Sequence, residues 1–70
     1  MKNFYLAVTI EQDGKYFSTV EKVGTNDNIV AFMQKRNYRY GHICESKKKA
    51  EELAEFWNAS YKANGTYLFD

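Results

Sequence analysis

The residues of this chain whose types best suit chemistry lie between positions 35 and 49. Six lysines and arginines fall in this stretch against a single carboxylate, Glu45. Aromatic rings are interleaved with the cations, and a nucleic-acid surface needs both, cations for phosphates and flat faces for base stacking. The residues that we predict for such a surface are Lys35, Arg36, Arg39, Tyr40, Lys47, Lys48 and Lys49.

The alternative interpretation of the same stretch is an ordinary solvated surface. The whole chain carries 10 basic and 9 acidic residues, a net charge of +1, whereas dedicated nucleic-acid-binding domains are usually more basic. Glu51 and Glu52 follow the lysines by one helical turn and could pair with them. Nucleic-acid binding is therefore the second hypothesis for function.

His42 and Cys44 form the only local pair of reactive side chains. On a strand they would share a face, close enough for a thiolate–imidazole pair. No further ligands accompany them, so a metal site here would have two protein ligands where structural zinc takes four. A half-buried histidine beside a small core cysteine explains the pair as well. We expect no enzymatic activity, no metal and no cofactor.

Length and composition indicate one small domain spanning residues 1–70. A chain this short is near the lower limit for independent folding. Six Tyr, five Phe and one Trp compensate, because aromatic rings bury much area at a small entropic cost. A core of this size also gains from self-association, so a homodimer is a reasonable expectation. The single cysteine fits a reducing compartment, and we expect a cytoplasmic protein with no signal peptide and no membrane partner.

The N-terminal part of the chain predicts a β-hairpin. Residues 3–11 alternate between apolar and polar positions, the period of a strand with one buried face. Asp13 and Gly14 form a tight turn, and residues 15–23 return as the second strand.

The register of this hairpin is open by one residue. A three-residue loop, with Gly14 in a bulge, places Leu6 opposite Val20. A two-residue loop places Leu6 opposite Glu21 and brings a carboxylate onto the apolar face. Because burying that charge without a partner is costly, we predict the bulge. In this register the outer face of the sheet carries Tyr5, Thr9 and Phe17.

The strongest helical pattern runs from Ser46 to Gly65. Serine is a good N-cap, and glycine after asparagine is a good C-terminal stop. One apolar stripe at spacings of three and four contains Ala50, Leu53, Ala54, Trp57 and Tyr61. We expect this stripe to pack on the sheet face that carries Leu6 and Val8.

The segments between and after these elements are shorter. Residues 29–36 are read as about two helical turns, although a strand could use the same residues. Residues 38–45 predict a third strand, with Ile43 as its surest inward residue. Residues 66–69 are too apolar to stay in water, and we expect them to join the sheet as a terminal strand.

The predicted architecture is α+β, a small mainly antiparallel sheet with one long C-terminal helix packed across a face. The sheet would contain the N-terminal hairpin and one or two further strands. The function that these features favour is a non-enzymatic binding or regulatory module that acts through protein–protein contact or self-association. Short exposed strands recruit other strands, and the interface residues that we predict are Tyr5, Phe17, Tyr67 and Phe69.

Three stretches of the sequence, KNFYLAVTIEQDGKY, SKKKAEELAEFWN and YKANGTYLF, carry a resemblance that covers nearly the whole chain. The chain resembles small uncharacterised proteins of Gram-positive gut bacteria, some of them carried on mobile elements. The resemblance implies a bacterial cytoplasmic accessory protein. It implies no activity and no functional residues.

Overall fold

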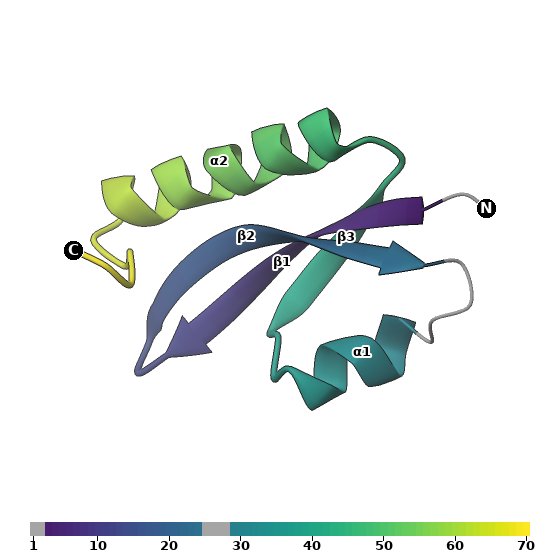
Figure 1. Ribbon diagram of the computed structural model, residues 1–70. Coiled ribbons are helices and arrows are strands. Elements are labelled where there is room, and N and C mark those ends of the chain that lie inside the picture. The colour runs from purple at the N-terminus through teal and green to yellow at the C-terminus, as the bar shows by residue number, and fades with distance from the viewer. Residues whose placement is uncertain (1–2, 25–28) are drawn as a thin grey trace.

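The computed structural model describes residues 3–24 and 29–70. Within these ranges three strands form one sheet in the order β2-β1-β3, with both outer strands antiparallel to β1. Helix α2 lies along one face of the sheet and the short helix α1 lies on the other (Figure 1). This confirms the predicted α+β class. The elements are β1 (Asn3–Gln12), β2 (Lys15–Gly24), α1 (Ile29–Lys35), β3 (Tyr40–Cys44) and α2 (Lys47–Ala63).

The turn between β1 and β2 is a two-residue turn, so the predicted bulge is wrong. Asp13 and Gly14 both have positive φ, 53° and 79°, the pairing of signs that a type I′ turn requires. Such a turn matches the right-handed twist of the two strands. Leu6 therefore lies opposite Glu21 and not opposite Val20.

The carboxylate of Glu21, whose burial made this register unexpected, has a hydrogen-bond partner from elsewhere in the fold. The phenol of Tyr38, in the connection between α1 and β3, donates to the carboxylate of Glu21. Burial raises the pKa of Tyr38 above its ordinary value of 10.0, and the hydrogen bond to Glu21 raises it further. A half-buried charge with a donor is far cheaper than an isolated one, and this donor could not be assigned from the hairpin alone.

The one-residue difference in register also changes which face each helix covers. The apolar cluster of Leu6, Val8 and Val23 packs against Met33 of α1 and Tyr38. The prediction that the long helix covers Leu6 and Val8 is therefore wrong, because α1 lies on that face. Helix α2 covers the opposite face, where small side chains allow close approach. The buried residues of that face and of the helix above it include Ala7, Thr9, Ser18, Ala50 and Ala54.

The third strand and the short helix form where the sequence indicates them. Residues 29–35 are helical, and β3 pairs with β1 so that Leu6 lies opposite Ile43. The prediction that Ile43 points inward is wrong, because its side chain is 48% exposed at the outer edge of the sheet. Gly41 is needed for close packing: a Cβ there would lie 3.2 Å from the Met33 side chain and 3.3 Å from Cγ1 of Val8.

The C-terminal segment joins the sheet through a single bridge. Tyr16 and Tyr67 form one parallel pairing at the start of β2. The amide of Tyr16 donates to the carbonyl of Thr66 at 2.7 Å, and the amide of Leu68 donates to the carbonyl of Tyr16 at 2.9 Å. The chain then turns back, since the amide of Asp70 donates to Tyr67 at 3.3 Å. The expected terminal strand is thus one residue pair long.

Replacing Tyr38 by Phe should lower the stability of the fold. Tyr38→Phe keeps the ring in the core and removes the donor to Glu21, so we expect the free energy of unfolding at neutral pH to fall by about 1–2 kcal/mol in urea titrations. Adding Glu21→Val should recover much of this loss, because both polar partners are then gone. An equal loss in the double variant would show that the loss does not come from leaving the Glu21 carboxylate without its donor.

The same tyrosine makes stability depend on alkaline pH. Its pKa is raised in the folded state, so the folded protein keeps the phenol proton to higher pH than the unfolded chain. This contribution to stability is fully present below pH 10.0, the ordinary value, and is lost as pH rises through the folded pKa. Between pH 10.0 and the raised pKa of the folded state, the free energy of unfolding of the wild type should therefore fall more steeply with pH than that of Tyr38→Phe.

Candidate functional site along the edge of strand β2

A chain of hydroxyl groups joins the sheet to helix α2. The hydroxyls of Ser18 and Thr9 are hydrogen bonded at 2.8 Å, and Thr9 is hydrogen bonded to the phenol of Tyr61 at 3.1 Å. The chain ends at Tyr40, whose phenol lies 2.6 Å from that of Tyr61. Burial, followed by this last hydrogen bond, raises the pKa of Tyr40. Buried polar groups that satisfy one another fix the position of the helix in a way that an apolar contact would not.

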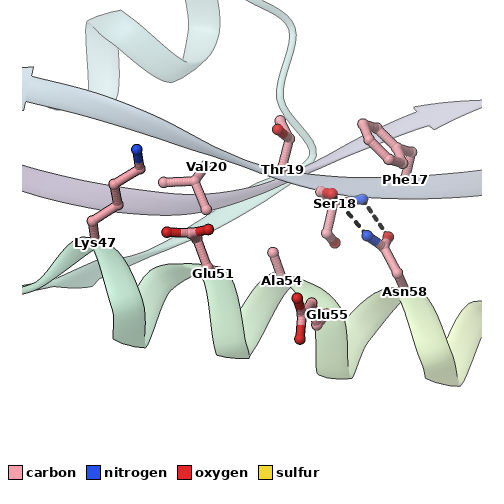
Figure 2. Close-up of a pocket in the computed structure, with 9 residues that line it drawn as sticks. All are labelled: Phe17, Ser18, Thr19, Val20, Lys47, Glu51, Ala54, Glu55 and Asn58. Atoms are coloured by element: carbon pink, nitrogen blue, oxygen red, sulfur yellow. Dashed lines mark hydrogen bonds between the residues drawn. The ribbon is translucent and has the colours of Figure 1, made fainter.

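The side chain of Asn58 extends this polar contact to the backbone of β2. The amide of Ser18 donates to Oδ1 of Asn58 at 2.7 Å, and Nδ2 of Asn58 donates to the carbonyl of Ser18 at 2.9 Å (Figure 2). Both backbone groups of Ser18 therefore point away from β1. Backbone groups alternate in direction along an antiparallel pair, so those of Val20 and Lys22 point outward as well.

The outer edge of β2 is closed at its start and open beyond Ser18. The C-terminal segment pairs with Tyr16, and Asn58 pairs with Ser18. Among the described residues, no backbone hydrogen bond joins Val20 or Lys22 to an element outside the sheet. This part of the strand presents donors and acceptors at the spacing that another strand would need.

A groove of about 300 Å³ lies between this edge and α2. In Figure 2 the side chain of Val20 reaches toward the helix, while Phe17 and Thr19 point to the other side of the strand. The helix contributes two carboxylates and one cation to the lining. The lining residues are Phe17, Ser18, Thr19, Val20, Lys47, Glu51, Ala54, Glu55 and Asn58.

Three aromatic rings gather beside the groove, and we call Phe17, Tyr67 and Phe69 the tail cluster. The ring of Phe17 meets those of Tyr67 and Phe69 edge-on, with centroids 6.2 and 4.8 Å apart. The ammonium group of Lys62 lies 4.7 Å from the centre of the Tyr67 ring. Phe69 is nevertheless 68% exposed, whereas Phe17 and Tyr67 are half-buried, so one ring of the cluster stays open to solvent.

The structure brings together three of the four predicted interface residues. Phe17, Tyr67 and Phe69 are in contact. Tyr5 is half-buried on the α2 face, opposite Lys22 and Cys44, whereas Phe17 lies on the α1 face opposite Ile10. The two residues were expected to share a face because of the bulged register, which the two-residue turn replaces.

The predicted nucleic-acid residues do not form one surface. Lys35 and Arg36 lie at the end of α1, and residues 47–49 begin α2 on the opposite face of the sheet (Figure 1). Arg39 lies 3.8 Å from a carboxylate oxygen of Glu11. Tyr40, the one aromatic ring in the predicted set, packs edge-on against Trp57, with centroids 5.6 Å apart.

His42 and Cys44 share the α2 face of β3, as their spacing predicts, yet they do not form a reactive pair. Cys44 is buried and its thiol lies 3.9 Å from the backbone carbonyl of His42, while the side chain of His42 is exposed. In the part of the chain that the structure describes, no three His, Cys, Asp or Glu side chains gather where they could hold a metal. Across the same ranges, no helix combines the length and the apolar character needed to span a bilayer.

Sequence reasoning missed Asn58 and the part of β2 beside it. A signal was present, because Asn58 follows Ala54 by four residues and precedes Tyr61 by three. This places an amide on the buried stripe of the helix. A polar side chain on such a stripe needs a hydrogen-bond partner. The partner itself, the backbone of Ser18, is 40 residues away in the sequence and only the fold identifies it.

Comparisons with protein-family models, with curated proteins and with solved structures find no match to this chain.

Removing the amide of Asn58 should loosen α2 from β2. For Asn58→Ala we expect the free energy of unfolding to fall by about 1–2 kcal/mol, because two hydrogen bonds are lost. The Ser18 amide should also exchange faster with solvent. Ser60→Ala, an exposed change on the same helix, is the control and should stay within about 0.5 kcal/mol of wild type. An unchanged exchange rate of the Ser18 amide in Asn58→Ala would contradict the role of these two hydrogen bonds.

Replacing Lys49 by Glu should stabilise the start of α2. Its amide already donates to the hydroxyl of Ser46 at 3.2 Å, and a glutamate there completes a capping box and suits the helix dipole. We expect a gain of about 0.5–1 kcal/mol, visible as a higher melting temperature. Lys49→Ala, which removes the charge without adding an acceptor, should gain less. A lower melting temperature for Lys49→Glu would contradict this account of the cap.

Proposed function

We propose that this protein is a non-enzymatic binding module that holds an extended segment of another polypeptide against the edge of β2. The observation that carries the proposal is the outward direction of the backbone groups of Val20 and Lys22, beside a groove that already has a helical wall. Strand addition uses such an edge for affinity and uses the neighbouring side chains for specificity.

The chemistry of the edge indicates what such a segment would contain. Side chains of an added strand alternate between the two faces of the sheet. Those on the α2 face would meet Glu51 and Glu55, which favours lysine or arginine there. Those on the α1 face would lie beside Phe17 and the rest of the tail cluster, which favours apolar or aromatic side chains. The expected ligand is an extended segment in which basic and apolar residues alternate.

A second copy of this chain fits the β2 edge poorly. In an antiparallel self-pairing centred on Glu21, the two copies of that carboxylate would lie directly opposite each other. Moving the centre to Lys22 would oppose two ammonium groups, and like charges in opposite positions destabilise a pair of strands. Moving the centre to Val20 would require the backbone of Ser18, which Asn58 occupies. We therefore favour a different polypeptide at this edge.

Selection from a displayed library of random peptides with the purified full chain tests the proposal. We expect selected peptides to alternate basic and apolar residues and to shift the amide resonances of β2. Val20→Pro should abolish binding, because it removes an outward donor while breaking no bond to β1. Glu51→Lys with Glu55→Lys should weaken binding at least tenfold, by loss of the charge contacts. Glu52→Lys, at an exposed helix position that does not line the groove, is the matched control.

Two outcomes would overturn the proposal. Selected peptides that bind the folded Val20→Pro variant as tightly as wild type would place the site elsewhere. Binding of DNA or RNA that falls steeply with salt and disappears when lysines 47–49 become glutamine would support the nucleic-acid hypothesis instead.

A further inference from the structure

The two edges of the sheet differ in how they are protected. The edge of β2 carries charged residues and is partly covered, the usual devices that prevent unwanted pairing. Strand β3 forms the other edge, and its sequence Tyr-Gly-His-Ile-Cys contains no acidic residue, lysine or arginine. Its side chains other than Cys44 are all exposed. An uncharged, exposed edge is what a strand that pairs with another chain presents.

The direction of the backbone groups along β3 follows from the hydrogen bonds already described. Because the groups of Ser18 point away from β1, those of Thr9, its opposite residue, point toward β3. The carbonyl of Thr9 does accept from the amide of Arg39 at 2.7 Å. The same alternation directs the groups of His42 toward β1, so those of Gly41 and Ile43 point outward.

We propose that two copies of this chain pair through their β3 strands, antiparallel and centred on His42, to form a continuous six-stranded sheet. In this register Gly41 of each copy lies opposite Ile43 of the other, so the outward groups of both residues find partners. The two copies are related by a two-fold axis, and the same surface is used on each. This contact is separate from the β2 edge and does not depend on the proposed function.

The side chains of the edge are complementary to themselves in this register. Ile43, 48% exposed in one copy, would lie opposite Gly41 of the other, beside the Met33 side chain that packs over that glycine. The residues that flank the strand have opposite charges. Arg39 precedes it and Glu45 follows it, and the antiparallel register sets Arg39 of each copy level with Glu45 of the other. Arg39 also lies 3.8 Å from Glu11 of its own chain, with 59% of its side chain exposed, so Glu45 of the other copy would add a second carboxylate beside each Arg39.

Neighbouring registers lose this match. A shift that centres the pairing on Ile43 would set Arg39 of one copy level with Lys47 of the other, and like charges repel. A shift that centres it on Gly41 would set Ile43 level with Arg39 and leave Glu45 beside Asn37. Charge complementarity thus favours His42 as the centre of the pairing.

Cross-linking tests the centre of the pairing directly. Residues opposite each other in a non-hydrogen-bonded pair have Cα atoms about 4.5 Å apart, within the range of a disulfide. We expect His42→Cys to form a covalent dimer under mild oxidation. Lys22→Cys, at the exposed edge of β2, is the matched control and should stay monomeric on a non-reducing gel. Equal cross-linking in both variants, or none in His42→Cys, would overturn the proposed centre.

Charge reversal tests the register in solution. Arg39→Glu and Glu45→Arg each replace two attractive pairs by two repulsive ones, so each variant alone should dimerise about tenfold more weakly than wild type. Mixing the two variants restores both attractive pairs and should recover the wild-type affinity in analytical ultracentrifugation at low salt. Circular dichroism verifies that each variant is folded. A wild type that remains a monomer at its highest soluble concentration, or a mixture no tighter than its components, would overturn the proposal.

Discussion

The turn at Asp13 and Gly14 is the constraint on which the rest of this structure depends. Two consecutive residues with positive φ allow only one register of β1 on β2, and a one-residue slip would turn every side chain of β2 to the other face. The observed register sets Thr9 beside Ser18. It thereby gives one face of the sheet a buried pair of hydroxyls and the other face an apolar cluster.

Each helix then finds the face that its own side chains suit. Helix α2 presents small residues together with Asn58 and Tyr61, which bond to the hydroxyls and backbone beneath them. Met33 of α1 and Tyr38, in the connection that follows α1, cover the aliphatic face, and Tyr38 also supplies the donor that Glu21 requires. The contacts of α2 and those of Tyr38 both require the observed register of the hairpin. In the bulged register, the polar groups of either set would lose their partners.

The arrangement leaves the sheet with two unlike edges, and both proposals about interaction rest on that difference. Along β2 the first residues are occupied by the chain itself, and the remaining backbone groups face a groove whose helical wall carries Glu51 and Glu55. Along β3 the exposed strand is uncharged between a cation and a carboxylate. We therefore propose a basic segment at one edge and a second copy of this chain at the other.

The sequence alone determined the elements whose signals are local. Alternation predicted the hairpin strands, Ser46 and Gly65 predicted the limits of the long helix, and the apolar residues 66–69 predicted that the tail joins the sheet. The register, the face that each helix covers and the exposure of Ile43 were decided by the tertiary structure. The physical reason is that Glu21 and Asn58 acquire their partners, Tyr38 and Ser18, from distant parts of the chain. No local pattern reports whether such a partner will be present.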